Sequence, residues 1–294
     1  MQLTVEQIEQ FNTRGALIAR GALAHADQQP LIDELSQWID DRARALEAEG
    51  KIDDLHEDAP FEMRYGLIFK QCPEIGQGMD IMHYRGRAMF EFLRNENLLD
   101  LLESLLGPEL TCNPIQHLRS KPPQAYEDRT GPSFHNAPWH QDAGVMMPEA
   151  EGSNVVTCWL PLANATVAHG CMEVLTGLVE TGYLRHQAAG GTTIVPDIMP
   201  DIEATPLECQ RGDVVLMSRF TPHRSTPNLT DECRWSLDLR YQPTGQHTGR
   251  TGHPDFIARS RRDPACELSD YNEWCRLWVD AFENPRGFVG HRGE

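Results

Sequence analysis

Hydrophobic residues at the start of the chain recur every three or four positions, which is the spacing of a helix with one buried face. Val5, Ile8 and Phe11 share that face, and Thr4 with Gln7 three residues later has the sequence of a capping box. The next stretch, GALIARGAL (15–23), has the pattern of a short strand between glycines. The pattern therefore predicts a helix followed by a strand.

Two longer helices are predicted farther along the N-terminal part. The first runs from about Pro30 to Gly50, because apolar residues at positions 31, 35, 38, 39 and 46 share a face and a glycine ends the pattern. Residues 51–80 are acidic, and we expect them to be irregular. The second helix is predicted from about Arg85 to Leu106.

Beyond residue 106 the hydrophobic pattern changes to short runs separated by Gly, Pro and Asn. These runs are LTCNPIQHLRS, NVVTCWLPL, GDVVLMS and RWSLDLRYQ, and their spacing is typical of an all-β sandwich or barrel. The later segment YNEWCRLWVDAF has the pattern of a last helix. We therefore expect a single domain over 1–294. It is mainly β with flanking helices: a helical part over 1–106, a β-core over about 107–243 and a helical C-terminal extension over 244–294.

The segment RWSLDLRYQ alternates apolar and polar residues, as a strand with two different faces does. The apolar face carries Trp235, Leu237, Leu239 and Tyr241, and the polar face carries Arg234, Ser236, Asp238 and Arg240. Taken alone, the strand favours a polar face in water. The alternative is a polar face that lines the lumen of a barrel, where a charged ligand binds.

The composition narrows the classes of partner and the cellular compartment that we expect for this protein. The net charge is −18, with 44 acidic against 26 basic residues, so nucleic acids and anionic membranes are not expected partners. The eight cysteines form no C-x-x-C pair and lie in apolar contexts, which is typical of reduced thiols in a cytoplasmic protein. The first residues do not resemble a signal peptide, and no run is long enough to span a bilayer. A small-molecule substrate is the expected partner, and no oligomeric state is predicted.

A His-x-Asp pair in PWHQDAG is the strongest chemical signal in the chain, although the same triplet also occurs at 25–27, 56–58 and 253–255. His140 and Asp142 lie at the start of the β-region, and His223 follows the strand GDVVLMS. Two histidines and one carboxylate are the donor set of many Fe(II) oxygenases, which leaves coordination positions open. Arg234 comes eleven residues after His223, on the polar face described above, and an arginine there suits a carboxylate.

Jointly, these motifs resemble the phytanoyl-CoA dioxygenase family of Fe(II)- and 2-oxoglutarate-dependent oxygenases. The matching segments cover residues 107–243 in the family's order. They are NPIQHLRSKPP, PWHQDAG, CWLPLANATVAHGCMEVLTG, RGDVVLMSRFTPHRS and CRWSLDLRYQP.

The resemblance implies a double-stranded β-helix, the cupin-like jelly roll, flanked by helices. It also assigns site residues. It implies that iron is bound by His140, Asp142 and His223. Arg234 would hold the distal carboxylate of 2-oxoglutarate with help from Ser225. Positions that line the cosubstrate site are matched by Gln141, Trp159 and His117, or Gln116 beside the last.

The reaction implied by the resemblance uses Fe(II), 2-oxoglutarate and O2. It oxidises an unactivated C–H bond of a small molecule and releases succinate and CO2. Asp142 favours oxygenation, because halogenating relatives carry a small residue in place of this carboxylate. The family's usual PGSH motif is replaced by LTGLVETG, so the substrate does not transfer with the resemblance. Phytanoyl-CoA itself is not favoured, since the acidic chain shows no basic patch for the phosphates of CoA.

Two other functions remain open from the sequence. One is a non-catalytic jelly-roll protein that binds a metal or acts as a sensor. The other is a metal-dependent isomerase or hydrolase on the same fold, which commonly uses more than two histidines at the metal. The first would not need Arg234 as a carboxylate clamp, and the second lacks a histidine cluster near PWHQD.

Overall fold

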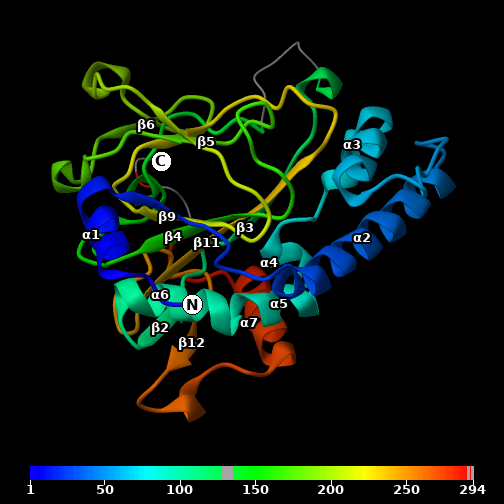
Figure 1. Cartoon of the computed structure of the whole chain (residues 1–294). Helices are drawn as coiled ribbons and strands as arrows, with labels where there is room; N and C mark the ends of the chain where they lie inside the picture. Colours follow the sequence, from blue (N-terminus) through cyan, green and yellow to red (C-terminus); the bar gives the residue numbers. More distant parts are fainter. Residues whose placement is uncertain (128–134, 290–291, 293–294) are drawn as a thin grey trace.

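The structure is a computed structural model, and it describes residues 1–127, 135–289 and 292. Figure 1 shows the helices of the N-terminal part along the left, right and lower borders of the strands. These helices are α1 (Val5–Arg14), α2 (His25–Ala48), α3 (Phe61–Gln71), α4 (Ile81–Tyr84), α5 (Arg87–Leu93) and α6 (Glu96–Leu106). In α1 the predicted capping box between Thr4 and Gln7 is present and Phe11 is buried.

Helix α2 begins at His25, five residues before the predicted start at Pro30. The Asp27 carboxylate accepts a hydrogen bond from the Ala24 backbone N–H at 2.7 Å and thereby caps the helix. The same carboxylate accepts from the Asn97 side-chain amide at 3.0 Å. Proline usually marks a helix start, but here Pro30 lies inside the helix, where the cap and the buried neighbours Leu31 and Ile32 outweigh its missing N–H.

Two further predictions for the N-terminal part were wrong. The acidic stretch 51–80 is not irregular throughout, because α3 buries Tyr65, Ile68 and Phe69 against the sheet. The helix predicted over 85–106 is broken once, giving α5 and α6, and the short helix α4 ends just before it. Arg85 adopts a left-handed conformation with φ 47°, and Asn95 caps α6 by accepting from the Leu98 N–H at 3.0 Å. The apolar periodicity continues across the break between α5 and α6, so the pattern alone does not reveal it.

The strands form one large and two small antiparallel sheets. The large sheet has the order β1-β9-β4-β11-β2-β12, and β3 pairs with β11 beyond the end of β2. Its strands are β1 (Ala16–Ala19), β2 (Glu109–Cys112), β3 (His117–Lys121), β4 (Val156–Pro161), β9 (Val214–Ser218), β11 (Arg234–Pro243) and β12 (Phe256–Ser260). The second sheet, in the order β10-β5-β8, contains β5 (Met172–Val174), β8 (Thr205–Leu207) and β10 (His223–Ser225). A hairpin joins β6 (His186–Ala188) to β7 (Thr192–Ile194).

The surroundings of the two faces of β11 distinguish between the two interpretations of its sequence. Its apolar face is fully buried against the helices, where the Trp235 ring stacks on Phe61 at 4.9 Å between centroids. On its polar face, Arg234, Asp238 and Arg240 line a cavity. The second interpretation, a polar face that lines an internal cavity, is therefore the one that the structure supports.

The segment after residue 243 is not helical throughout, contrary to expectation. It contributes β12, which pairs with β2 and extends the large sheet, and then the predicted helix α7 (Tyr271–Glu283). One hydrophobic cluster includes residues of α1, α2, α6, β11, β12 and α7. No helix among the described residues is long and apolar enough to cross a membrane. The result is an antiparallel β-fold of the jelly-roll type, with helices packed on the large sheet.

Candidate metal centre

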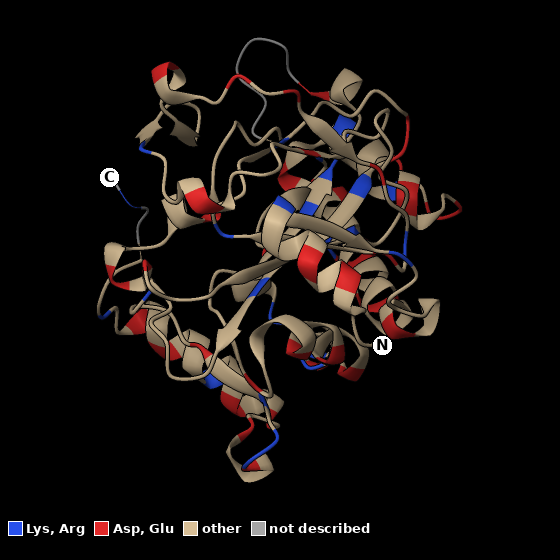
Figure 2. Ribbon diagram, turned by 60° about the vertical axis from the view of Figure 1, so that its left-hand side comes forward, with Lys and Arg blue, Asp and Glu red and all other residues tan. Residues whose placement is uncertain are grey.

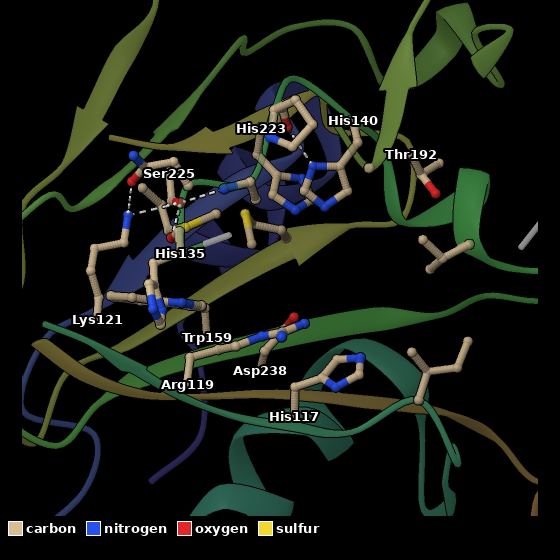
Figure 3. A pocket seen from close by; sticks show the side chains of 18 of the residues that line it. His117, Arg119, Lys121, His135, His140, Trp159, Thr192, His223, Ser225 and Asp238 are labelled. Atoms are coloured by element: carbon tan, nitrogen blue, oxygen red, sulfur yellow. Dashed lines mark hydrogen bonds between the residues drawn. The ribbon is translucent and has the colours of Figure 1, made fainter. Parts of the chain in front are cut away.

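Two histidines that are distant in the sequence lie side by side in the structure. The His140 N–H donates to the His223 carbonyl at 3.0 Å, and the His223 N–H donates to the His140 carbonyl at 2.8 Å. This antiparallel bridge places the two imidazole rings with their centroids 4.1 Å apart, and Figure 3 shows both rings pointing into the same pocket. The backbone therefore sets the spacing of the two side chains.

Each imidazole is oriented by a carbonyl two residues before it. His140 Nδ1 lies 2.8 Å from the Pro138 carbonyl, and His223 Nδ1 lies 2.9 Å from the Thr221 carbonyl. Because a carbonyl only accepts, Nδ1 of each ring carries the proton, and Nε2 keeps its lone pair. Hydrogen bonds from Nδ1 to a carbonyl are typical of histidines that bind a metal through the other nitrogen.

Asp142 completes the cluster from a fully buried position. Its Oδ1 lies 3.9 Å from His223 Nε2 and accepts a hydrogen bond from Arg240 Nη2 at 2.5 Å. Its Oδ2 accepts from the Thr157 hydroxyl. The candidate ligand atoms of His140, Asp142 and His223 all lie within 4.8 Å of one another. Among the described residues, this is the group of three that could hold a metal ion.

Burial and neighbouring charges put His140 and Asp142 in the protonation states that a metal requires. Burial, reinforced by the adjacent His223, lowers the pKa of His140 to about 3 and keeps its ring neutral. Burial alone would raise the pKa of Asp142, but the charge of Arg240 outweighs it and holds that pKa below its ordinary value. A neutral imidazole and an ionised carboxylate are metal-binding forms, and a set of two histidines with one carboxylate suits Fe(II).

The three other His-x-Asp triplets lie elsewhere and serve structural roles. Asp27 caps α2, as described above. His56 lies beside Asp54, with Nδ1 3.4 Å from the carboxylate. The His253 ring contacts Trp278 at 5.2 Å between centroids. The structure therefore singles out the pair at 140–142.

A cavity of about 280 Å³ opens beside the three residues, and Arg234 faces it. Arg234 Nη1 donates to the Gly170 carbonyl at 2.6 Å, and the guanidinium lies over the Trp159 ring, 5.1 Å from its centroid. Its Nε is buried and has no partner, and no acidic side chain among the described residues pairs with Arg234. Burial lowers the pKa of Arg234 to about 10, so the guanidinium stays charged at neutral pH. A buried cation without a charged partner is unfavourable, and an anion bound beside it would compensate its charge.

Lys121 also lines this cavity, and the sequence motifs did not identify it as a site residue. It lies directly opposite Arg234 in the register of β3 and β11. Its Nζ donates to Ser225 Oγ at 3.0 Å and to Asn136 Oδ1 at 2.8 Å. Burial, with a further contribution from Arg234, lowers the pKa of Lys121 to about 6. Two basic side chains opposite each other are unfavourable unless an anion lies between them. The alternation of basic residues in HLRSK was the available signal.

The remaining predicted residues divide into two groups. Ser225, Trp159 and His117 line the cavity. Gln141 does not, contrary to expectation: its buried amide donates to the Gly182 and Phe220 carbonyls at 2.9 and 2.7 Å. Gln116, the alternative to His117, does not line the cavity either.

Gln116 is buried between β2 and β11. Its Nε2 donates to the Arg240 carbonyl of β11 at 2.9 Å and lies 3.2 Å from the Cys112 Sγ of β2, so the side chain connects these two strands. His117, the next residue, points to the other face of β3, and its Nδ1 lies 2.9 Å from Asp80 Oδ2. The alternation of side chains along a strand therefore selects His117 as the cavity residue.

Comparison with known proteins gives a family and a fold. The family model described as phytanoyl-CoA dioxygenase (PhyH) matches residues 11–236. The 2-aminoethylphosphonate dioxygenase of Uncultured bacterium HF130_AEPn_1 is 21% identical over 244 residues, covering 81% of this chain and 81% of that protein.

Two solved structures share the fold across most of the chain. The non-heme monooxygenase ThoJ in its apo form is 21% identical, covers 95% of this chain and 94% of its own, and has a TM-score of 0.65. The epimerase SnoN, in complex with Fe3+, α-ketoglutarate and nogalamycin RO, is 17% identical. That match covers 84% of this chain and 87% of SnoN, with a TM-score of 0.57. At these identities the likeness establishes a common architecture.

Proposed function

Because the chain belongs to the phytanoyl-CoA dioxygenase family of enzymes that use iron, 2-oxoglutarate and O2, we propose that it oxidises an unactivated C–H bond of a small molecule. Succinate and CO2 are the co-products. His140, Asp142 and His223 are the proposed iron ligands. The observation that carries the proposal is the convergence of their ligand atoms within 4.8 Å, with both Nδ1 atoms already bonded to carbonyls.

The proposed site of the distal carboxylate of 2-oxoglutarate lies between Arg234, Lys121 and Ser225. Arg234 supplies a buried guanidinium with one unpartnered N–H, and Lys121 Nζ lies 3.0 Å from the Ser225 hydroxyl. These three side chains line the cavity that the two imidazoles also line. Figure 3 shows Lys121 and Ser225 beside the two rings. A dicarboxylic acid can therefore reach the metal with one end and the basic side chains with the other.

The protein's own residues prepare this reaction in three ways. The Nδ1 hydrogen bonds fix the ring planes, and Arg240 and Thr157 fix the carboxylate of Asp142. The Trp159 ring lies against the guanidinium of Arg234 and limits the water that can compete with the carboxylate. Iron with 2-oxoglutarate and O2 supplies the oxidant for the C–H bond, and the cofactor carries that chemistry. We further propose that the chain acts as one domain, since a single hydrophobic cluster joins α1, the large sheet and α7.

The test is an anaerobic titration with Fe(II) and 2-oxoglutarate, monitored by the visible charge-transfer band, followed by exposure to O2 and a succinate assay. His140→Ala, Asp142→Ala and His223→Ala should abolish the band and succinate release. His56→Ala is the matched control, because it alters a His-x-Asp histidine outside the cavity, and it should leave both unchanged. Full activity in any ligand variant would refute the assignment.

Arg234→Ala provides the second arm of this test. It should raise the 2-oxoglutarate concentration needed for half-maximal rate by about a hundredfold, because a hydrogen-bonded charge pair is lost, while iron stays bound. Arg224→Ala, which removes a half-exposed arginine paired with Glu173, is the control and should leave the requirement unchanged. Metal binding without succinate under any of the substrates tried would instead favour the sensor alternative.

A further inference from the structure

The cavity is basic although the protein is acidic. The chain carries a net charge of −18, and in Figure 2 the acidic positions are spread over the outer helices and loops, whereas several basic positions fall on the strands. Among the described residues that line the cavity, one acid faces five basic side chains. The acid is Asp238, and the basic residues are Arg119, Lys121, Arg234, Arg240 and Arg250. The acidic surface does not account for the basic side chains that line the cavity. Their positive charge indicates that the cavity binds an anionic ligand.

The proposed metal and cosubstrate account for only part of the positive charge. Lys121 and Arg234 are assigned to the distal carboxylate. Arg240 pairs with Asp142 at 2.5 Å and with Asp238 at 3.2 Å. Arg250 donates to the Val145 carbonyl at 3.0 Å from Nη2. A ferrous ion and a 2-oxoglutarate dianion cancel each other's charge, so the filled site remains positive.

Arg119 is the basic residue of the cavity to which the proposed function assigns neither a ligand nor a protein partner. It lies on β3 between His117 and Lys121, on the same face of the strand, and Figure 3 shows all three along one side of the pocket with the two imidazoles opposite. Among the described residues, its guanidinium has no hydrogen-bond or ion-pair partner. Its cross-strand neighbour is Ser236, whose hydroxyl is fully buried and also lacks a partner.

The position of Arg119 also makes it accessible to an incoming ligand. Arg119 lines both the metal cavity and an adjoining cavity of about 360 Å³, whose wall includes Tyr65 and Phe69 of α3. It therefore lies where the two spaces meet. A guanidinium at such a junction can pair with an anionic group while the rest of the molecule extends towards the metal.

We infer that the substrate is a small organic anion, a carboxylate or phosphonate, whose charged group is bound by Arg119. The inference rests on the proposed function, because it takes Arg234 and Lys121 as occupied by the cosubstrate. The metal cavity of about 280 Å³ restricts the part of the substrate that reaches the metal to a small group. A cationic substrate is disfavoured by the same positive charge.

The experiment is an anaerobic calorimetric titration of the holoenzyme, loaded with Fe(II) and saturating 2-oxoglutarate. Methylphosphonate and acetate are the anionic probes, and dimethyl methylphosphonate is the neutral match. The variants are Arg119→Gln, Arg119→Lys and the control Arg262→Gln, an exposed arginine outside both cavities. Saturating 2-oxoglutarate prevents the probes from occupying the carboxylate site at Arg234.

At least one anion should bind the wild-type holoenzyme in the millimolar range, and the neutral ester should not. Arg119→Gln should weaken that binding about tenfold or more, Arg119→Lys should weaken it less, and Arg262→Gln should leave it unchanged. Failure of both anions to bind, or equal binding by Arg119→Gln, overturns the inference. In either case a normal charge-transfer band with 2-oxoglutarate shows that the proposed function stands, whereas loss of the band in the wild type would count against the proposed function itself.

Discussion

At the scale of single residues, the Asp142 carboxylate is held from both sides. Arg240 donates to Oδ1 at 2.5 Å, and the Thr157 hydroxyl donates to Oδ2. Arg240 also bonds to the Ile115 carbonyl at 3.0 Å, which anchors its guanidinium. The carboxylate therefore has one orientation before any metal binds. Holding a ligand in this way reduces the reorganisation that metal binding requires.

Thr157→Val tests this role, since it removes the hydroxyl and keeps the volume nearly constant. We expect iron affinity to fall by about 10–100-fold, as is typical when a hydrogen-bond partner of a metal ligand is lost. Fe(II) titration under anaerobic conditions measures the change. The matched control is Thr111→Val, another buried threonine, whose Oγ lies 3.0 Å from Thr244 Oγ and far from the cavity. Equal iron affinities for wild type and Thr157→Val would show that the hydroxyl does not position Asp142.

If 2-oxoglutarate binds beside Lys121 as proposed, its binding should be linked to the protonation of this lysine. Its pKa is about 6 in the folded protein and 10.5 for an ordinary lysine. Between these values the unfolded chain holds the extra proton, so the free energy of unfolding rises as the pH increases from about 6 towards 10.5. A bound carboxylate stabilises the ammonium and raises the pKa of Lys121 again.

Binding of 2-oxoglutarate near pH 8 should therefore take up nearly one proton. Calorimetry in buffers of different ionisation enthalpy measures the uptake. Lys121→Met should abolish the proton uptake, and Lys70→Met, which alters an exposed lysine on α3, should retain it. If uptake persists in Lys121→Met, another group is the proton acceptor.

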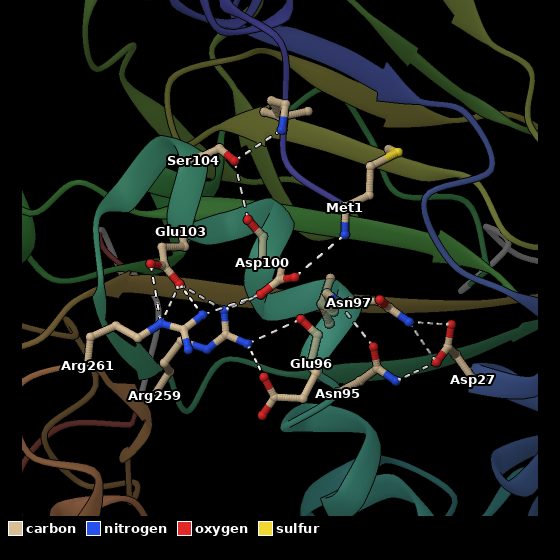
Figure 4. Close-up of polar contacts among 12 residues, drawn as sticks. Met1, Asp27, Asn95, Glu96, Asn97, Asp100, Glu103, Ser104, Arg259 and Arg261 are labelled. Atoms are coloured by element: carbon tan, nitrogen blue, oxygen red, sulfur yellow. Dashed lines mark hydrogen bonds and ion pairs between the residues drawn. The ribbon is translucent and has the colours of Figure 1, made fainter.

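At the scale of elements, ion pairs connect β12, at the edge of the large sheet, to α6. Figure 4 shows Arg259 of β12 and the nearby Arg261 meeting the acidic side chains of α6. Arg259 is 3% exposed, and its Nη1 lies 2.8 Å from Asp100 and 2.9 Å from Glu103. The side chain of Arg261 is 52% exposed, so water screens its pair with Glu103.

Arg259→Gln should lower the free energy of unfolding by about 1–3 kcal/mol, because a buried cation that pairs with several carboxylates is lost. Its acidic partners are partly exposed and can be rehydrated, which keeps the loss below that of a fully buried pair. Arg261→Gln, on the same segment, should cost under about 1 kcal/mol. Urea unfolding gives both values, and equal losses would contradict the distinction.

At the scale of the whole molecule, the site lies between two sheets. His223 and Ser225 come from β10 of the small sheet, whereas Lys121 and Arg234 come from β3 and β11 of the large one. Iron and 2-oxoglutarate would therefore make contacts with both sheets at once. Ligands that bind only the folded state stabilise it by mass action.

Each ligand at about a hundredfold excess over its Kd should add about 2.7 kcal/mol to the free energy of unfolding. For a chain of this size, each kcal/mol raises the Tm by about 2–4 °C. Anaerobic thermal unfolding with Fe(II) and 2-oxoglutarate measures the shift, and a chelator should reverse the part due to iron. His223→Ala should lose the iron-dependent part, and His56→Ala should keep it. An unchanged Tm in the wild type with both ligands would contradict binding between the sheets.

Much of the site follows from local patterns in the sequence. The alternation along RWSLDLRYQ defined two faces of one strand, and the eleven-residue spacing from His223 singled out Arg234 on its polar face. Such periodicities depend only on backbone geometry, which is the same in every strand. For the same reason α1 and α7 were predicted where the structure has them.

The sequence by itself determined the fold class, the family and the two segments that carry the proposed iron ligands, because those signals are local or lie in ordered motifs. Only the tertiary structure decided that the polar face of β11 lines a cavity, that Lys121 opposes Arg234, and that Gln141 turns away. It also decided where the helices between 81 and 106 break and that β12 joins the sheet. Strand register and side-chain burial depend on contacts between segments far apart in the chain, which no local periodicity encodes.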